Sequence, residues 1–378
     1  MSQRIDATIY YGPPSWFQEQ TQNIDGDSFL DIIFKRDAES RRHIIVPSDA
    51  SVIEAQPEDG PVHLVVNSGD YASLVEGAIS NFGGIIQSID PKNLYLNNPP
   101  EQVRTHVERI ADVTEVQFQF SRFTPEVLRE FYNGFGEHLV GQNSVKNELL
   151  AAIYPLTSDR ENKPVVVMFY GPSGVGKTET AKFMSELVGG DVFRKQFSML
   201  HSEKFASYVF GGSHQEPSLA LDLMERDCNV ILFDEFDKAS SVFHSAFYEL
   251  FDEGVLEDKN YRANVGSPLI ICTSNYGSED AVKKALGEAL YSRFNAFIEF
   301  HPLSLDDVKV VADRLIDAKF SKLDSSEQSQ LNIDGLRIQI KDLATKFGNI
   351  RKLGNFIDQV IGFRLAMSIL EKVGDQEV

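Results

Sequence analysis

The residues best suited to chemistry form a glycine-rich run, which follows an apolar segment and precedes a helical pattern. The run fits the spacing G-x-x-x-x-G-K-T, in which glycines let backbone N–H groups surround phosphate oxygens. Lys177 would hold the β- and γ-phosphates, and the hydroxyl of Thr178 would bind Mg²⁺. A tight turn could use the same residue types, but a strand before it and a helix after it favour a phosphate site. The run thus predicts a site for ATP and Mg²⁺ built from Gly171, Pro172, Ser173, Gly174, Val175, Gly176, Lys177 and Thr178.

A second candidate feature is the run 230–235, in which four apolar residues precede two carboxylates. An apolar strand that ends in acids is weak evidence on its own, but a phosphate loop needs a metal-binding carboxylate as its partner. Asp234 would orient the Mg²⁺ shell, and Glu235 would polarise the water that attacks the γ-phosphate. The two runs together predict an ATP-hydrolysing enzyme.

Three continuous apolar segments must position these side chains: PVVVMFYG before the glycine run, NVILFDE at 229–235 and PLIICTSN at 268–275. Strands of this kind are buried on both faces, as in parallel sheets covered by helices. Open parallel sheets bind ligands at the carboxyl ends of their strands. The segments predict a large α/β ATPase domain over residues 126–302 with its polar residues at one sheet edge.

The flanking regions differ from this α/β pattern. Residues 1–125 contain strand-like runs at 29–34, 43–46 and 62–66, a helical pattern at 71–88 and breaks at Pro91, Pro99 and Pro100, which predict an α+β domain without a recognisable motif. Residues 303–378 are helical in pattern, with candidate helices at 304–322, 334–346 and 350–371. We therefore expect three domains, the last a small helical one.

Composition narrows the class of partner. The 378 residues carry a formal charge of −20, which opposes binding to nucleic acid and to anionic membranes. No leader pattern and no run of eighteen apolar residues is found, so we expect a soluble, cytoplasmic protein. Cys228 and Cys272 lie in or beside apolar runs and are expected to be core thiols. The histidines are scattered, and we expect no further metal site.

Beyond the two nucleotide runs, the sequence of the chain resembles that of the Clp-type AAA+ ATPases, most closely the second ATPase ring of the ClpB/ClpA-like unfoldases. The resemblance covers residues 136–357 and rests on matching segments in the same order: LVGQ at 139–142, GPSGVGKTETAK at 171–182, ILFDEFDKA at 231–239, FYELFDEGVLED at 247–258, IICTSN at 270–275 and RFNAFIEFHPLS at 293–304.

The resemblance implies roles for five further residues. Val140 and Gly141 would line the adenine pocket, Asn275 would be sensor 1, Arg293 the arginine finger and Arg351 sensor 2 on a helical lid. Three of them have a plainer reading: a turn residue for Asn275, a surface ion pair for Arg293, and a helix-face arginine for Arg351, whose spacing from its glycine is one residue longer than usual. A finger that acts on a neighbouring subunit implies a ring, and the family suggests a homo-hexamer.

The chain departs from the family where Clp unfoldases grip polypeptide. The segment SEKFASYVFGGSHQEPSLALDL is shortened where the aromatic grip should lie, and we expect Tyr208 and Phe210 to serve in packing. The tripeptide 361–363 has the form of a loop that docks onto the peptidase ClpP, but its apolar neighbours indicate core packing, so docking to ClpP is not expected.

Two functions remain open on the sequence. The leading hypothesis is a ring-forming ATPase that remodels a protein client or adaptor selected by residues 1–125. The alternative is an ATP-dependent oligomerisation switch or scaffold that threads no polypeptide, which the shortened loop favours. A nucleic-acid motor is disfavoured by the acidic charge.

Overall fold

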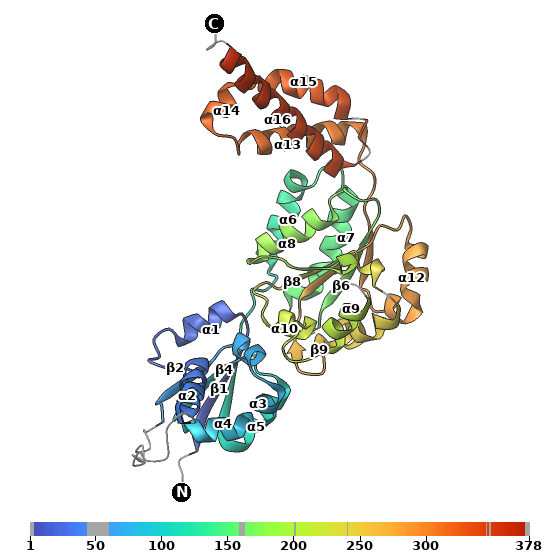
Figure 1. The fold of residues 1–378 in the computed structure, drawn as a ribbon. Helices are drawn as coiled ribbons and strands as arrows, with labels where there is room; N and C mark the ends of the chain where they lie inside the picture. The colour runs from blue at the N-terminus through green and yellow to red at the C-terminus, as the bar shows by residue number, and fades with distance from the viewer. Residues whose placement is uncertain are drawn as a thin grey trace.

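Three units follow one another along the molecule (Figure 1). The computed structural model describes residues 4–43, 60–158, 163–199, 202–239, 241–344, 346–347 and 349–374. The N-terminal unit contains β1 to β5, the central unit runs from α6 to β12, and the C-terminal helical unit contains α13 to α16. Each has hydrophobic clusters of its own.

The N-terminal unit is a five-stranded sheet in the order β2-β3-β4-β1-β5, and every pairing among its described residues is parallel. Its strands are β1 (Ile5–Tyr11), β2 (Asp27–Ser28), β3 (His63–Val66), β4 (Asn93–Asn97) and β5 (Ala111–Gln117). Its helices are α1 (Pro14–Thr21), α2 (Phe29–His43), η1 (Ser68–Ser73), α3 (Glu76–Ser80), α4 (Phe82–Ile89) and α5 (Glu101–Ile110). The prediction of an α+β domain was therefore wrong, since this unit alternates strands and helices as α/β folds do.

The error began at residues 29–34, which we predicted as a strand and which open helix α2. Phe29 is buried, Ile33 is partly buried and Phe34 is 61% exposed, so the burial follows a helix and not a strand. A short apolar run cannot distinguish the two by itself. The strand at 62–66 is confirmed as β3, whereas most of the one predicted at 43–46 lies outside the described residues. The helix predicted at 71–88 is split into η1, α3 and α4.

At the carboxyl edge of the N-terminal sheet, asparagine side chains bond to the backbone around Gly12. Asn98 accepts a hydrogen bond from the Gly12 N–H (3.0 Å) and donates one to the Gly12 carbonyl (2.8 Å). Asn97 donates to the carbonyls of Tyr10 and Gly12. Asn98 is fully buried with a φ of 43°, a left-handed conformation that Asn adopts more readily than most residues. These bonds satisfy backbone groups of Tyr10 and Gly12 at the edge where open sheets usually bind ligands.

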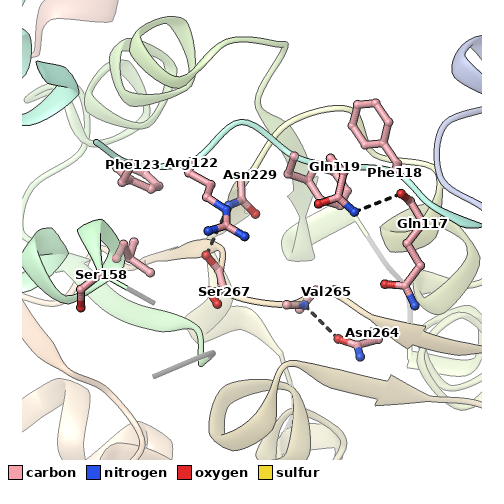
Figure 2. Close-up of a pocket in the computed structure, with 13 residues that line it drawn as sticks. Gln117, Phe118, Gln119, Arg122, Phe123, Ser158, Asn229, Asn264, Val265 and Ser267 are labelled. Atoms are coloured by element: carbon pink, nitrogen blue, oxygen red, sulfur yellow. Dashed lines mark hydrogen bonds between the residues drawn. The ribbon is translucent and has the colours of Figure 1, made fainter. Parts of the chain in front are cut away.

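The connection after β5 fastens the N-terminal unit to the central one. Phe118 packs edge-on against Trp16, and Phe120 lies under the guanidinium of Arg226 at 4.0 Å. Arg226 is buried and donates to the carbonyls of Leu223 and Val265, and burial lowers its pKa to about 9. The same connection forms one wall of a cavity of about 490 Å³, whose other walls include residues 264–267 (Figure 2).

The central unit holds a second parallel sheet, ordered β12-β6-β11-β8-β7, beside a separate antiparallel hairpin of β9 and β10. The sheet strands are β6 (Val165–Tyr170), β7 (Phe193–Gln196), β8 (Val230–Asp234), β11 (Leu269–Thr273) and β12 (Ala296–Glu299), and the hairpin strands are β9 (Val255–Glu257) and β10 (Arg262–Asn264). The longer helical elements are α6 (Pro125–His138), α7 (Asn143–Ile153), α8 (Lys177–Val188), α9 (Ser202–Phe210), α10 (Leu219–Met224), α11 (Tyr248–Glu253) and α12 (Glu279–Tyr291). Short 3-10 turns are η2 (Tyr154–Thr157), η3 (Phe197–Met199), η4 (Phe236–Lys238) and η5 (Ser241–Phe247).

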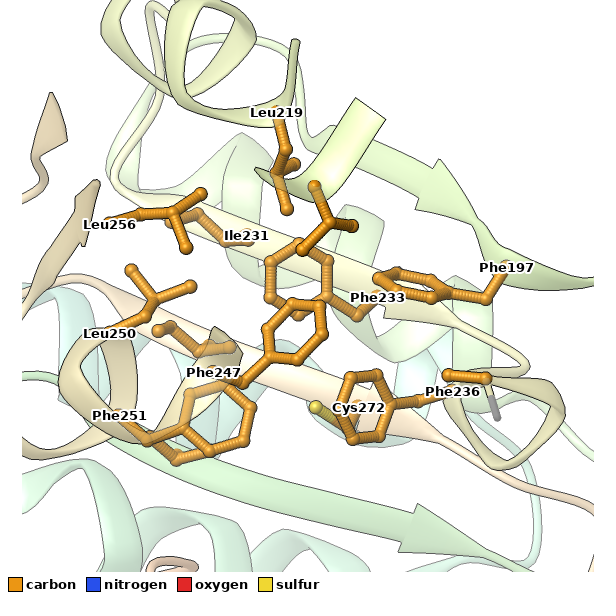
Figure 3. Close-up of a cluster of buried hydrophobic side chains, with 14 of the residues drawn as sticks. Phe197, Leu219, Ile231, Phe233, Phe236, Phe247, Leu250, Phe251, Leu256 and Cys272 are labelled. Carbon is orange, nitrogen blue, oxygen red and sulfur yellow. The ribbon is translucent and has the colours of Figure 1, made fainter. Parts of the chain in front are cut away.

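The three strands expected from continuous apolar runs are confirmed as β6, β8 and β11, and each is buried along its whole length. Alternate residues enter cores on opposite faces: Ile231 and Phe233 lie in one cluster, and Val230 and Leu232 in the other. Figure 3 shows the first cluster, in which Phe233 meets aromatic side chains of residues 236–251. Cys228 and Cys272 are buried and free, as predicted.

The C-terminal unit consists of α13 (Leu305–Phe320), α14 (Ser325–Ser329), α15 (Ile333–Ala344) and α16 (Ile350–Gly374), so the three predicted helices are confirmed and α14 was missed. Ser304 and Asp307 form a capping box that begins α13. The stretch 350–370 of α16 is long and apolar enough to cross a membrane by composition alone, but Leu353, Ile357 and Ile361 pack into the core of this unit.

Candidate active site

The glycine-rich run links β6 to α8 and forms a loop whose backbone only glycine accommodates easily. Gly171, Gly174 and Gly176 have φ values of 129°, 77° and 111°. A Cβ on Gly171 would lie 2.2 Å from the Phe300 carbonyl oxygen, and one on Gly176 would lie 2.7 Å from Leu139. The sequence thus builds a loop with its backbone exposed toward the N-terminus of α8, which is the arrangement that binds phosphate.

Lys177 lies at the centre of this loop, with only 8% of its surface exposed. Its Nζ donates to the carbonyl oxygens of Gly171 and Pro172, both at 2.7 Å, and to Oδ1 of Asn275 at 3.2 Å. Burial lowers the pKa of Lys177 to about 8, although the nearby carboxylate of Asp234 acts in the opposite direction. The predicted lysine and the predicted sensor 1 residue are therefore in direct contact.

The two carboxylates stand at the end of β8, beside the loop. Oδ1 of Asp234 accepts a hydrogen bond from Thr273 Oγ1 (2.6 Å), and this hydroxyl also accepts one from the Glu235 N–H (2.9 Å). Glu235 has a φ of 53°, in the left-handed region, so it turns out of the strand direction. Thr273 on β11 fixes both residues of the acid pair.

Two further residues, on the edge strand β7, contact the acid pair and were missed by the sequence analysis. Arg194 binds Oδ2 of Asp234 through Nη2 (2.5 Å) and Nε (3.1 Å), and Gln196 donates to Oε2 of Glu235 (3.2 Å). The strand reads Phe-Arg-Lys-Gln, without the apolar run that revealed its neighbours. Only its pairing with β8 shows that these side chains reach the carboxylates.

The segment 139–142 joins the loop to the start of the C-terminal unit. Gln142 is buried and donates to the carbonyls of His301 (2.8 Å) and Val175 (3.4 Å). Gly141 has a φ of 75°, and a Cβ there would lie 2.6 Å from a carboxylate oxygen of Asp307. Val140 and Gly141 lie in this segment, which the resemblance would place beside the base, and within the segment only Gln142 makes a described side-chain bond to the loop.

An apolar cavity of about 130 Å³ lies at this junction, between the phosphate loop and the C-terminal unit. It is lined by Pro172, Gly174, Val175, Pro302, Leu303, Val308, Phe347, Asn349 and Ile350. Asn349 donates to the carbonyl and the hydroxyl of Ser173. Arg351 follows in the first turn of α16, is exposed, and donates its backbone N–H to Oδ1 of Asn349 (2.8 Å).

Arg293 lies near the amino-terminal end of strand β6, whereas the phosphate loop lies at the carboxyl end. Asn295, two residues later, exchanges hydrogen bonds with Val166 at the start of β6, whereas the phosphate loop follows the end of β6. At about 3.3 Å per residue, the five steps from Val166 to Gly171 span roughly 16 Å. Arg293 is bound to Asp252 (2.9 Å) and is stacked on Tyr248. It does not meet the other predicted site residues within its own chain.

Comparison with known proteins identifies the central unit. Residues 162–320 match the family model of the AAA domain (Cdc48 subfamily). The chaperone protein ClpB of Chlamydia caviae is 31% identical over 217 residues, which are 46% of this chain and 24% of that protein. ClpB of Chlamydia trachomatis serovar D is 31% identical over 234 residues, or 49% and 26% of the two chains.

The chain carries a Clp-type AAA+ ATPase module. It spans only about a quarter of the length of these ClpB relatives. A longer match, to ClpB of Mycoplasmoides gallisepticum, is 26% identical and covers 71% of this chain and 42% of that protein. A structure described as closed-state Hsp104 with ATPγS and FITC casein matches with a TM-score of 0.57 at 16% identity, covering 97% of this chain and 89% of that one. At that identity the likeness concerns the fold.

The residues of the AAA+ module fit a nucleotide with its metal. The Lys177 ammonium is bonded to loop carbonyls that phosphate oxygens could replace, and Thr178 follows it in the first turn of α8. Asp234 is a nearly buried carboxylate whose second oxygen is held by the partly exposed Arg194. In the described part of the chain, no cluster of three His, Cys, Asp or Glu residues is arranged to hold a metal ion, so protein ligands to Mg²⁺ would be few.

The shortened segment of the module makes contacts within its own chain. The hydroxyl of Tyr208 donates to Asp222, while Phe210 is 42% exposed and lies against Phe243. The loop that follows, 211–217, contacts the N-terminal unit: His214 and Gln215 each lie 2.8 Å from the carbonyl oxygen of Leu74. The place of the expected polypeptide grip is therefore taken by a contact within the chain.

The tripeptide 361–363 lies within α16. Ile361 is buried in the core of the C-terminal unit, as predicted, but Phe363 is 68% exposed. The prediction of core packing was wrong for Phe363, because it lies about 200° around α16 from Ile361, on the opposite face, while Leu365 further along the helix still packs against the core.

Proposed function

We propose that this chain is a Mg²⁺-dependent ATPase that assembles into a ring and uses the ATP cycle to remodel a protein partner. The proposal of a ring rests on the position of Arg293, which lies near the amino-terminal end of β6, while the phosphate loop of the same chain follows the carboxyl end. An arginine finger near the amino-terminal end can serve only the site of a neighbouring chain. Hexameric assembly is the form that the family resemblance suggests.

The proposed roles follow from the contacts. The cradle for ATP comprises Gly171, Pro172, Ser173, Gly174, Val175, Gly176 and Lys177, with Val140, Gly141 and Arg351 about the base and the lid. When bound, Mg²⁺ would be held by Thr178 and Asp234 and would neutralise charge on the phosphates. Glu235 accepts a hydrogen bond from the attacking water and aligns it, while Asn275 helps to place that water.

The partner domain in this proposal comprises residues 1–125, followed by the ATPase domain at 126–302 and the helical lid at 303–378. The acidic charge of the chain and its similarity to ClpB chaperones support a protein partner over nucleic acid. Similarity to soluble chaperones likewise supports the expectation of a cytoplasmic protein.

The second candidate function is an ATP-dependent oligomerisation switch or scaffold that threads no polypeptide. It is favoured by the contact of His214 and Gln215 with Leu74, because this contact occupies the loop that would otherwise grip a client. A casein excess that stimulates ATP turnover would favour remodelling, and turnover indifferent to casein would favour the switch.

The ring is tested by the mass of the Glu235→Gln chain in solution, measured by light scattering with ATP, with ADP and without nucleotide. We expect ATP alone to produce a closed oligomer near six subunits. A monomer under all three conditions would leave Arg293 without a site to complete and would contradict the ring.

The finger is tested separately by mixing two inactive variants. Arg293→Ala should be inactive alone, yet it should supply a working phosphate loop when mixed with a chain that lacks Lys177. Recovery of ATP turnover in the mixture is the expected result, and mixtures that stay inactive although they co-assemble would argue against a finger acting between chains.

A further inference from the structure

Strand β7 contacts the nucleotide site with one face and a different set of residues with the other. Side chains alternate across a strand, so Arg194 and Gln196 reach the acid pair while Lys195 points away from it. The Nζ of Lys195 binds Oδ2 of Asp222 at 2.6 Å. Strand β7 is one of the two edge strands of the sheet and, among the described residues, pairs with β8 alone.

Asp222 gathers two contacts at a single oxygen. Its Oδ2 accepts the Lys195 bond and also a 2.5 Å hydrogen bond from the hydroxyl of Tyr208 on α9. Burial and the nearby carboxylate raise the pKa of Tyr208, so its hydroxyl keeps its proton and donates. Asp222 belongs to α10, which is anchored in the core by Leu219 and Leu223. A displacement of β7 therefore acts directly on α10.

The N-terminal unit grips α10 from both ends. At the C-terminal end, the carboxylate of Glu225 accepts a 2.6 Å hydrogen bond from Ser68, whose exposure is only 6%. Ahead of the helix, His214 and Gln215 hold the carbonyl of Leu74. Ser68 and Leu74 both lie in the segment 68–74, so one short stretch of the N-terminal unit contacts residues at both ends of α10.

We propose that α10 couples the nucleotide site to the N-terminal unit, with Asp222 as a positioning residue that acts through Lys195 on β7. This inference rests on the proposed binding of ATP at the phosphate loop. Mg²⁺ held by Asp234 would compete with Arg194, and loss of the Arg194 bond would leave β7 held to the acid pair by Gln196 alone. The strand then shifts, Asp222 carries the shift to α10, and the contacts of Ser68 and Leu74 change with it. In this proposal, nucleotide binding moves the N-terminal unit of the same chain.

The coupling is measured by amide hydrogen exchange of the segment 68–80 in the full chain, with and without Mg²⁺ and saturating ATPγS. Unaltered Glu235 is kept because its contact with Gln196 belongs to the coupled set. We expect ATPγS to change the exchange rate in this segment at least threefold. Asp222→Asn should abolish that change, whereas the matched control Asp227→Asn, an exposed acid just beyond the helix, should retain it.

A second variant tests the reverse direction. Coupling free energies are reciprocal, so Ser68→Ala in the N-terminal unit should change the Kd for ATPγS at least threefold, measured by calorimetry. Absence of ATPγS binding by the unaltered chain would overturn the proposed function and this inference together. Binding with unchanged exchange at 68–80 would overturn the inference alone, as would an Asp222→Asn chain that responds like the unaltered one.

Discussion

The N-terminal unit and the AAA+ module each contain a five-stranded parallel sheet, and the two sheets differ at the carboxyl ends of their strands. In the module, this edge carries Lys177, Asp234 and Glu235 around an exposed glycine loop. In the N-terminal unit, the same edge carries Asn97 and Asn98, whose amides bond to the backbone around Gly12. A shared architecture thus serves chemistry in one unit and packing in the other, and the residues at the strand ends make the difference.

The largest expected effect removes chemistry from the module while leaving its fold intact. We expect Glu235→Gln to bind ATP but to hydrolyse it at least about a hundredfold more slowly, because the amide cannot polarise the attacking water. Single-turnover kinetics measure the loss, and the melting temperature serves as the control for folding. Retained turnover would remove Glu235 from the mechanism.

The counterpart in the N-terminal unit should remove stability and not chemistry. Asn98→Ala leaves the buried N–H of Gly12 without a partner, which costs about 1–3 kcal/mol, and leaves its carbonyl with the Asn97 bond alone. Urea unfolding should show the loss, while the exposed bond of Asn93 to the Val62 carbonyl offers a matched control, Asn93→Ala, with a much smaller cost. If both variants lost the same free energy of unfolding, the Asn98 bonds would have no special role in stabilising this edge.

The buried Lys177 of the module predicts that ATP affinity depends on pH. The asparagines at the N-terminal edge do not titrate and have no such effect. The pKa of Lys177 is lowered to about 8, and phosphate oxygens must raise it when they replace the loop carbonyls. ATP affinity should therefore hold its full value below pH 8 and fall as pH rises through 8, by up to about tenfold per pH unit. Lys177→Arg, which stays charged, should bind without this slope in calorimetric titrations.

The smallest effect concerns the edge strand β7. Gln196→Ala removes one hydrogen bond to a charged oxygen of Glu235, and such bonds contribute about 1.5–3 kcal/mol at most when buried. Because Gln196 is only partly buried, we expect kcat to change by about threefold to tenfold while KM for ATP stays the same. An effect as large as that of Glu235→Gln would mean that Gln196 takes part in the chemistry.

Local sequence was a good guide wherever one segment decides its own structure. The glycine loop follows from residues whose φ values and close backbone contacts require glycine, and β6, β8 and β11 follow from runs that bury both faces of a sheet. It misled at residues 29–34, where a short apolar run fits a helix as well as a strand. It was silent about Arg194 and Gln196, since the strand that carries them is polar.

The sequence by itself determined the phosphate loop, the acid pair and the parallel strands that bring them to one edge, because each depends on residues close together in the chain. Tertiary structure alone decided that Arg194 holds Asp234, that Gln142 ties the loop to His301 across 159 positions, and that His214 meets Leu74 across 140. These bonds join segments that lie far apart in the sequence and that no repeating pattern of residues relates to each other. They exist because strand order and unit packing bring the segments together, and through them the N-terminal unit contacts the module.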